Sequence, residues 1–500
     1  MIQRLKSTWE TRPLIIILIL AAIFRILAAI FSKGYAMSDD HFVVIHVAQR
    51  WLEGYDNWFN EGHPVGFSLV YPGLHYIFFY LLKYIGITDP QTKMMLVRLI
   101  HAFYSLLIVL FGYLITLKLD SLKTAKQVGL ILAVFWILPF MSVRNLIEVV
   151  CIPPLIIGFY LIISAIDKQN YKYLLWAGIS FGIAFAFRYQ TLIFTGSVGL
   201  ILLFQKEWKN FIHFSSGTIL SLFLVQGLVD WIAWGYPFAG FHYYIIHNIS
   251  HRFSYIIGPW YQYLLLILGM FIPPVSFFLL FGFVKTWKKY AILFWPTFLF
   301  LIFHSYFPNK QERFILPLLP FIIILGIVGW NRYLRESDFW ANKKKWLRVS
   351  WIFFGIVNGI LLLILTFTYP KKTRIEPLVY LSHKNDVTGI IIEYNKKNMP
   401  WFPRFYLAKK IPVLRFYPEK TVPEFKEELA MQKNNLPNYV FFYGNDALDE
   451  RIKKLENLLE VKLIFERRIN PGLIDEILFL LNPKHNLNLT SFIYKISDNQ

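Results

Sequence analysis

The sequence predicts an α-helical protein that crosses a membrane many times and ends in a small α/β domain. Of its 500 residues, 56% are hydrophobic and only 16% are charged, whereas soluble domains carry about 25% charged residues. Long apolar segments recur as far as residue 369 and are separated by short basic loops. Residues 370–500 lack such segments. We therefore expect a transmembrane domain at 1–369 and an extracytoplasmic domain at 370–500.

Twelve apolar segments are candidate membrane helices: 13–31, 65–86, 94–117, 127–143, 149–166, 173–187, 189–204, 211–229, 261–284, 290–307, 314–330 and 349–369. The first is long enough to cross a hydrocarbon core of about 30 Å and is too long for a cleaved signal peptide. The Lys- and Arg-rich loops between them predict the cytoplasmic side by the positive-inside rule. With a cytoplasmic N-terminus, 65–86 and 94–117 cannot both cross, so the rule predicts about 11 crossings.

The net charge of +20 and the single cysteine exclude several kinds of protein. The basic residues stand in short clusters between apolar runs, which favours anionic lipid head groups over nucleic acid as their partners. Because Cys151 is the only cysteine, the chain has no intramolecular disulfide and no thiolate metal cluster.

The C-terminal segment alternates between strand-like and helix-like patterns. Amphipathic spacing predicts helices at 424–433 and 447–460, and short β-branched or aromatic runs predict strands at 389–396, 439–444 and 461–469. A small α/β domain follows from this alternation.

The first outer loop, 32–64, carries two adjacent carboxylates. Asp39 and Asp40 follow the first membrane segment by about eight residues and precede a short amphipathic stretch at 42–52. One carboxylate alone is explained as a helix N-cap favoured by the helix dipole. Two adjacent carboxylates are more than an N-cap requires. A carboxylate whose pKa is tuned by desolvation can act as a general base on a hydroxyl group. We therefore predict Asp39 and Asp40 as catalytic residues.

The second outer loop, 230–260, is rich in aromatic residues and histidine. An aromatic belt at the membrane surface explains the rings alone, but it does not explain one carboxylate and three histidines in a single loop. The histidine spacing lacks a convincing metal-ligand set, so no metal is expected. Candidate orienting or sugar-binding residues in and next to this loop are Asp230, His242, His247 and Trp260.

Charged residues also lie in or beside the membrane segments. Lys310 and Arg313, in an outward connection, can neutralise a phosphate leaving group, and Glu312 can orient them. Intramembrane polar residues are functional candidates by default. Arg188 is a further candidate for phosphate, and Asn145 and Glu148 for orienting groups. The alternative is a buried Arg–Glu pair that stabilises the helix bundle.

With these residues assembled, the chain resembles glycosyltransferase family 22. The acidic pair stands in MSDDHFVVIHVAQRWLEGYDNW, where Met37-Ser38 replace the family's His-Pro. Further matches are Tyr71-Pro72, the segment NLIE that contains Asn145 and Glu148, GISFGIAFAFRY with Arg188, GPWYQY with Trp260, NKQERF with Lys310, Glu312 and Arg313, and the tail segment WFPRFYLAKKIPVLRFYPE at 401–419. The departures indicate a distant member, with a bacterial source among the alternatives.

The resemblance implies a GT-C fold and an inverting glycosyltransferase whose donor is a polyprenyl- or dolichyl-phosphate mannose. The acceptor would be lipid-linked or a glycan, at the outer face of a bacterial plasma membrane or of the ER membrane. Asp39 or Asp40 would serve as the base, and no cofactor is expected. Two alternatives stay open: a transporter or flippase of a lipid-linked sugar, and a non-catalytic scaffold.

Overall fold

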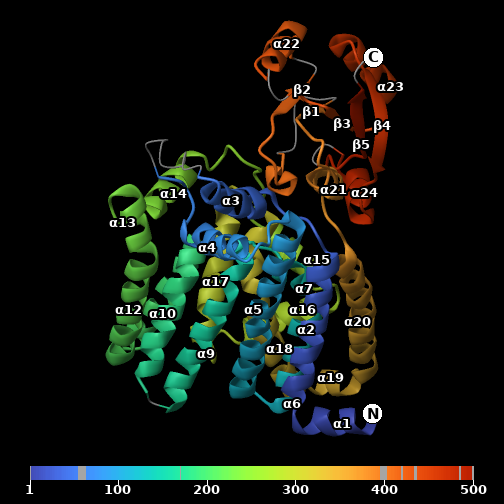
Figure 1. Ribbon diagram of the computed structural model, residues 1–500. Helices are drawn as coiled ribbons and strands as arrows, with labels where there is room; N and C mark the ends of the chain where they lie inside the picture. The colour runs from blue at the N-terminus through green and yellow to red at the C-terminus, as the bar shows by residue number, and fades with distance from the viewer. Residues whose placement is uncertain are drawn as a thin grey trace. The chain divides into compact units, whose positions relative to one another are not determined.

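The computed structural model describes residues 2–54, 64–168, 170–394, 402–417, 420–432, 436–483 and 486–497, with side chains from Ser7 onward. Its chain divides into two compact units, each of which is described by itself. The first unit comprises Met1–Ile30, Arg50–Ile77 and Val97–Phe367, and the second comprises Phe31–Gln49, Phe78–Leu96 and Thr368–Gln500. Figure 1 labels the helices and strands.

The chain up to residue 367 is helical in its described parts. The α-helices are α1 (Ile2–Thr11), α2 (Pro13–Phe31), α3 (His46–Leu52), α4 (Val70–Tyr84), α5 (Pro90–Leu119), α6 (Leu122–Val134), α7 (Ile137–Ser142), α8 (Ile147–Val150), α9 (Ile152–Lys168), α10 (Lys172–Phe187), α11 (Leu192–Phe204), α12 (Trp208–Ser221), α13 (Leu228–Trp234), α14 (Ala239–Ser250), α15 (Gln262–Met270), α16 (Val275–Lys285), α17 (Ala291–Tyr306), α18 (Leu319–Glu336), α19 (Asp338–Asn342) and α20 (Lys344–Phe367). The π- and 3-10 turns are η1 (Asp40–Ile45), η2 (Tyr189–Thr191), η3 (Leu222–Gly227) and η4 (Glu312–Leu318).

These helices confirm the mostly helical membrane fold, but they do not confirm the count of 11 crossings. Among the described residues, six helical segments are long and apolar enough to span a membrane: Pro13–Phe31, Pro90–Leu119, Ile147–Lys168, Trp208–Trp234, Glu312–Glu336 and Lys344–Ser382. A seventh is obtained if the pair α15 and α16, bent by 119°, is one span. Three shorter apolar helices are Lys172–Phe187, Tyr189–Phe204 and Ala291–Tyr306. Of the two segments in conflict, α5 meets the length of a span and the 15-residue α4 does not.

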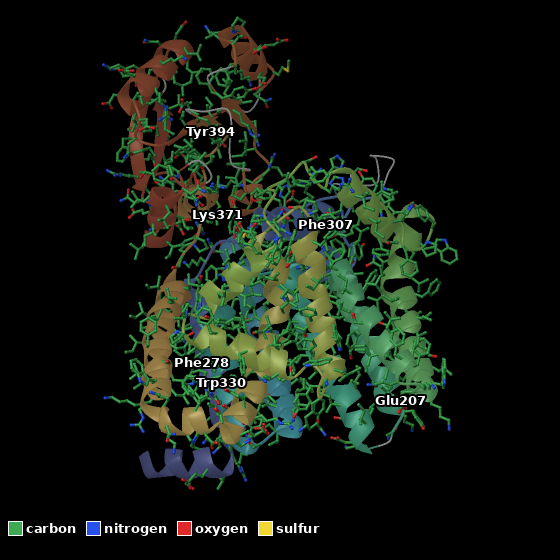
Figure 2. All side chains as sticks on the ribbon, turned by 180° about the vertical axis from the view of Figure 1, so that it is seen from behind. Glu207, Phe278, Phe307, Trp330, Lys371 and Tyr394 are labelled. Atoms are coloured by element: carbon green, nitrogen blue, oxygen red, sulfur yellow. The ribbon has the colours of Figure 1, made fainter. Side chains whose placement is uncertain are left out.

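Glycines allow two helix pairs of the first unit to pack closely. A Cβ on Gly178 of α10 would collide with the backbone of α12 at Phe214, and one on Gly282 of α16 would collide with that of α18 at Gly326. Small residues permit such backbone approach between membrane helices, where dispersion replaces the hydrophobic effect. Next to the second contact, the rings of Phe278 and Trp330 stack with centroids 4.5 Å apart (Figure 2).

The second unit contains a five-stranded mixed sheet of order β2-β1-β3-β5-β4. β1 pairs in parallel with β2 and β3, while β5 is antiparallel to both β3 and β4. The strands are β1 (Ile390–Glu393), β2 (Val413–Phe416), β3 (Tyr439–Tyr443), β4 (Lys462–Ile469) and β5 (Ser491–Ser497). The accompanying helices are α21 (Lys372–Ser382), η5 (Arg404–Leu407), α22 (Val422–Ala430), α23 (Leu448–Leu459) and α24 (Leu473–Leu481). The small C-terminal α/β fold is thereby confirmed.

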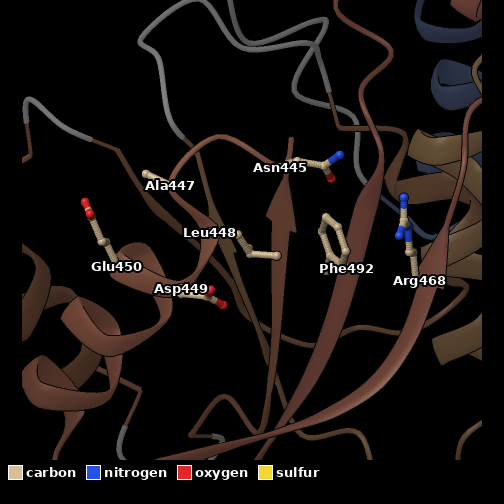
Figure 3. Close-up of a pocket in the computed structure, with 7 residues that line it drawn as sticks. All are labelled: Asn445, Ala447, Leu448, Asp449, Glu450, Arg468 and Phe492. Atoms are coloured by element: carbon tan, nitrogen blue, oxygen red, sulfur yellow. The ribbon is translucent and has the colours of Figure 1, made fainter.

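A shallow recess lies where α23 begins (Figure 3). Its lining residues are Asn445, Ala447, Leu448, Asp449, Glu450, Arg468 and Phe492. Two carboxylates in the first turn of α23 oppose the binding of an anion there. None of the residues predicted from the sequence to be functional lines this recess.

Candidate active site

Two arginines of the first unit converge on one buried carboxylate. The Arg188 Nη1 lies 3.1 Å from Oε1 of Glu148, and the Arg313 Nε lies 3.4 Å from the same oxygen. All three residues are buried. Each stands at an interruption of a helix: Glu148 in the short α8, Arg188 in extended backbone between α10 and η2, and Arg313 in η4. Broken helices are the usual way to place polar groups at membrane depth.

This cluster carries more positive than negative charge. One carboxylate faces two guanidinium groups, and Arg188 also donates from Nη2 to the Phe314 carbonyl at 3.1 Å. Among the described residues, Nε of Arg188 and Oε2 of Glu148 have no hydrogen-bond partner. A buried cluster with an excess of cations and an unused donor is suited to an anionic ligand. The ion pair that the sequence left as an alternative is present, and it coexists with this capacity.

Lys310 is engaged with the end of α17. Its Nζ donates to the carbonyls of His304 and Ser305, each at 2.6 Å, and to that of Phe307 at 2.5 Å. The ammonium also lies 5.2 Å from the ring centroid of Tyr263. Burial lowers the pKa of Lys310. All three protons of this cation therefore stabilise helix-end carbonyls in the structure, and its predicted contact with phosphate stays a prediction.

Asp230 anchors the helix α14 of the predicted second outer loop. Its Oδ2 accepts a hydrogen bond from the Gly240 N–H at 3.0 Å, at the start of α14. Beside it, Gln226 donates to the Tyr189 hydroxyl at 3.1 Å and accepts from the Ser68 hydroxyl at 2.7 Å. The fully buried Asp230 thus belongs to a polar network that ties α14 to η2 and η3.

The other predicted residues of the first unit differ in exposure. His242, Glu312 and Trp260 are exposed, and the Trp260 side chain is 70% accessible. His247 Nε2 lies 3.1 Å from the Tyr255 hydroxyl. Asn145 is buried. The exposed side chains can meet a ligand or the membrane surface.

Residues 32–49 of the first predicted outer loop, here called the acidic loop, belong to the second unit, and the two carboxylates in it differ. Asp39 is exposed and makes no capping hydrogen bond to the helix that follows, whereas Asp40 is buried and accepts a hydrogen bond from Ala36 N–H at 3.1 Å. The N-cap explanation therefore does not account for Asp39. Residues 55–63 of this predicted loop lie outside the described part of the chain.

Aromatic residues of the C-terminal segment hold the acidic loop. The His41 ring stacks between Tyr35, with centroids 4.8 Å apart, and Tyr406, at 5.2 Å. Burial raises the pKa of Tyr35 to about 12, and burial followed by the charges of His46 and Lys371 lowers the pKa of His41. Both rings are therefore neutral near pH 7. The predicted tail segment 401–419 provides one face of this stack, although its ends, 401 and 418–419, are outside the described residues.

Sequence reasoning missed Lys371, which lies beside the acidic loop. Its Nζ donates to the Ala36 carbonyl at 3.0 Å, and its backbone N–H donates to the Asp475 carboxylate at 2.9 Å. Figure 2 labels Lys371 just beyond the end of α20. A signal was present: two lysines directly follow a membrane segment on the side that the sequence predicts to be the outer one. They depart from the positive-inside rule there, as Lys310 and Arg313 do.

No group of three or more His, Cys, Asp or Glu side chains in the described part of the chain is arranged to hold a metal ion.

Comparisons with known proteins identify the family of this chain. The model of the Alg9-like mannosyltransferase family matches residues 16–393. The curated GPI mannosyltransferase 3 of Saccharomyces cerevisiae is 24% identical over 202 residues, which are 38% of this chain and 31% of that protein. The match thus spans about a third of the yeast protein's length.

Solved structures show the same fold at low identity. ArnT of Cupriavidus metallidurans, bound to undecaprenyl phosphate, has a TM-score of 0.55 and 11% identity, with 96% of this chain and 97% of that one covered. The oligosaccharyltransferase of Archaeoglobus fulgidus, tethered to an acceptor peptide, has a TM-score of 0.52 and 11% identity, covering 90% and 71%. The fold predicted from the motifs, that of GT-C proteins, is therefore shared with these enzymes.

The family model covers well over half of the chain, and the spanning helices indicate an integral membrane protein. The predicted family and the predicted class of enzyme, a membrane glycosyltransferase, are both confirmed: the chain belongs to the Alg9-like mannosyltransferase family.

Proposed function

We propose that this protein transfers a mannose residue from a polyprenyl- or dolichyl-phosphate donor to a lipid-linked or glycan acceptor. Family membership supports the sugar. The observation that carries the donor class is the buried pairing of Arg188 and Arg313 with the single carboxylate of Glu148. A structural neighbour that was solved with undecaprenyl phosphate supports the same class.

In the proposed step, the acceptor hydroxyl oxygen attacks the anomeric carbon of the donor sugar. The bond from that carbon to the phosphate oxygen breaks, and the lipid phosphate leaves with the electron pair. Asp39 takes the hydroxyl proton, because it is the exposed member of the acidic pair. Attack opposite the leaving group inverts the anomeric centre, so a β-linked donor gives an α-linked product.

The arginines act on the leaving group. A phosphate that departs from a sugar gains negative charge, and preorganised guanidinium groups in a water-poor site stabilise that charge. Arg188 and Arg313 are held by Glu148 and the Phe314 carbonyl, so little reorganisation is needed when the charge develops. Lys310 is the third predicted phosphate ligand. It would have to exchange a carbonyl for the phosphate.

We further propose that residues 1–369 form the catalytic transmembrane domain and that residues 370–500 form an extracytoplasmic domain. The acidic loop, the loop at 230–260 and the C-terminal domain would then lie on the outer face, in the plasma membrane of a bacterium or the ER membrane of a eukaryote. The distribution of basic loops in the sequence supports this orientation. His242, His247 and Trp260 would bind or orient sugars there.

The test is sugar transfer by purified protein. Wild type, Asp39→Asn and the control Asp446→Asn, which changes an exposed carboxylate of the C-terminal unit, receive radiolabelled polyprenyl-phosphate mannose and a lipid extract from the host. We expect wild type and Asp446→Asn to label lipid, and Asp39→Asn to lose about 10²- to 10⁴-fold in rate, the usual contribution of a general base.

Two results would overturn parts of this proposal. Undiminished transfer by Asp39→Asn would remove Asp39 as the base. No transfer by wild type from mannose, glucose or aminosugar derivatives of polyprenyl phosphate would reject the donor class.

A further inference from the structure

The C-terminal segment reaches the acidic loop through the backbone of one residue, Ala36. Ala36 accepts a hydrogen bond at its carbonyl from the Lys371 ammonium, at 3.0 Å, and donates one from its N–H to the Asp40 carboxylate, at 3.1 Å. The cation and the carboxylate therefore bind opposite ends of the same residue. A loop held in this way keeps its carboxylates in place as long as both partners are present.

A second contact fixes the ammonium of Lys371 on the loop. The Nζ lies 4.4 Å from the ring centroid of Tyr35. A cation over the face of an aromatic ring is attracted to the ring's electrons, and more so when water is excluded, as it is around the buried Tyr35. Tyr35 in turn stacks on His41, the residue next to Asp40.

The backbone of Lys371 is itself anchored by the C-terminal unit. Its N–H donates to Oδ2 of the buried Asp475 at 2.9 Å, and Asn488 donates to Oδ1 of the same carboxylate at 2.7 Å. Lys371 adopts a left-handed conformation, with φ of 56°. That conformation is unfavourable for a residue with a side chain, so the anchoring bonds have to hold it.

The neighbouring backbone is also in close contact. Gly34 has φ of 81°, and a Cβ there would collide with the Pro370 carbonyl, so the loop accepts only glycine at this point. The Ser32 hydroxyl donates to the Thr368 carbonyl at 2.6 Å. The segment 368–371 and the segment 32–36 therefore pack side by side within the second unit.

Charge explains why a cation is needed at this place. The ionisable groups that interact electrostatically with Lys371 are Asp39 and Asp40 of the acidic loop, and Arg374 and Asp475 of the C-terminal segment. The His41 ring does not supply charge, because burial keeps it neutral. Three carboxylates therefore accompany two cations. Lys371 binds the backbone of the acidic loop at Ala36, and Arg374 interacts with the Tyr35 hydroxyl.

We infer that Lys371 is a positioning residue for the acidic pair: from the C-terminal segment it fixes the loop through Ala36 and Tyr35, and its positive charge balances the negative charge of the buried Asp40. The inference rests on the proposed function in so far as Asp39 or Asp40 serves catalysis. The part of the second unit that begins at Thr368 then has a functional role, because it supplies a cation on which the acidic loop depends. Asp475 and Asn488 set the place of that cation.

The first experiment is the pH profile of sugar transfer by Lys371→Met, Lys371→Arg and the matched control Lys372→Met. Loss of the cation should favour protonation of Asp40, which weakens its hydrogen bond from the Ala36 N–H and loosens the loop that carries Asp39. The acidic limb of the Lys371→Met profile should therefore move to higher pH by about one unit. Lys371→Arg keeps the charge and should keep the limb in place. Lys372→Met removes the next lysine, which has no hydrogen bond to Ala36, and should match wild type.

A purely structural role gives a different result. If Lys371→Met lowers the rate equally at all pH values, or leaves the profile unchanged, the inference is wrong. If Lys371→Met cannot be produced as folded protein, Lys371→Gln takes its place. If the acidic limb of the Lys371→Gln pH profile then coincides with that of Lys371→Arg, the inference is again rejected.

The second experiment does not depend on sugar transfer. Thermal unfolding is measured for Lys371→Met, Asp40→Asn and the double variant. If Lys371 acts on the Asp40 charge, the two changes should be non-additive, with Lys371→Met costing less in the Asp40→Asn background. Additive losses would contradict the link, whether or not wild type transfers mannose. A failure of the proposed function is thus distinguished from a failure of this inference.

Discussion

The Arg188 guanidinium lies 3.1 Å from the Glu148 carboxylate, and both side chains are buried in the helical unit. Forty residues of sequence and two helices separate them, so neither residue predicts the other. Their pairing joins two explanations that the sequence left apart. The pair links the short helix α8 to the end of α10, and the cluster that it forms with Arg313 has the excess positive charge that suits an anion.

Glu148→Gln should destabilise the protein strongly. The substitution leaves two buried guanidinium groups without a carboxylate, and breaking a buried ion pair costs about 3–5 kcal/mol. Thermal unfolding in detergent measures the loss. The control Glu312→Gln changes an exposed carboxylate in the same part of the fold and should leave the unfolding temperature unchanged. Equal unfolding temperatures for the two variants would contradict the role assigned to Glu148.

Arg313→Lys should impair transfer more than folding. Lysine keeps the charge but loses the planar fork that binds two phosphate oxygens, so a loss of about 10²-fold in the rate of transfer is expected. Transfer rates are measured at saturating and at limiting donor concentration, because the first reports the chemical step and the second also reports donor binding. The control is Arg252→Lys, an exposed arginine of the second outer loop. A wild-type rate for Arg313→Lys would show that its fork does not contact the leaving phosphate.

Lys310→Met tests two roles for one cation. Because Nζ donates to three carbonyls at the end of α17, its loss should lower the unfolding temperature. The exposed Lys288→Met, in a basic loop, serves as the control. An unchanged unfolding temperature together with a raised KM for the donor would instead favour the phosphate contact that the sequence predicts.

Gly240→Ala should disturb the second outer loop. A Cβ there would lie 3.0 Å from the Tyr189 hydroxyl and 3.4 Å from both carboxylate oxygens of Asp230. Overpacking of this kind costs about 1–3 kcal/mol. Gly196→Ala, at an exposed helical glycine with no atom within 4 Å of the added carbon, should be neutral or stabilising. Thermal unfolding of the pair decides, and equal stability would show that α14 yields at no cost.

Much of the secondary structure could be predicted because it depends on local patterns. The segment 173–187 is matched by α10 and the strand 439–444 by β3. The single segment predicted at 261–284 is instead broken after Met270, where Pro273 and Pro274 remove two backbone donors, and its halves are bent by 119°. Two short strands, β2 and β5, were not predicted, because their pairing with distant strands stabilises them.

The residues of the candidate site could be predicted from the sequence, but which of them lie together in the structure could not. Charged residues beside apolar segments stand out in any sequence because burying them is costly, and this singled out Arg188, Glu148 and Arg313. The difference between the two carboxylates of the acidic loop was not visible. Asp39 and Asp40 are neighbours of one type, and only the packing around them buries one and exposes the other.

The sequence by itself determined that this is a membrane protein of one glycosyltransferase family, because apolar length and motif residues are read along the chain. Tertiary structure alone decided which charges meet. Lys371 reaches the loop of Asp40 across 331 positions of sequence because Asp475 holds its backbone and Ala36 accepts its ammonium. Such contacts depend on how distant segments pack, and no local pattern contains that information.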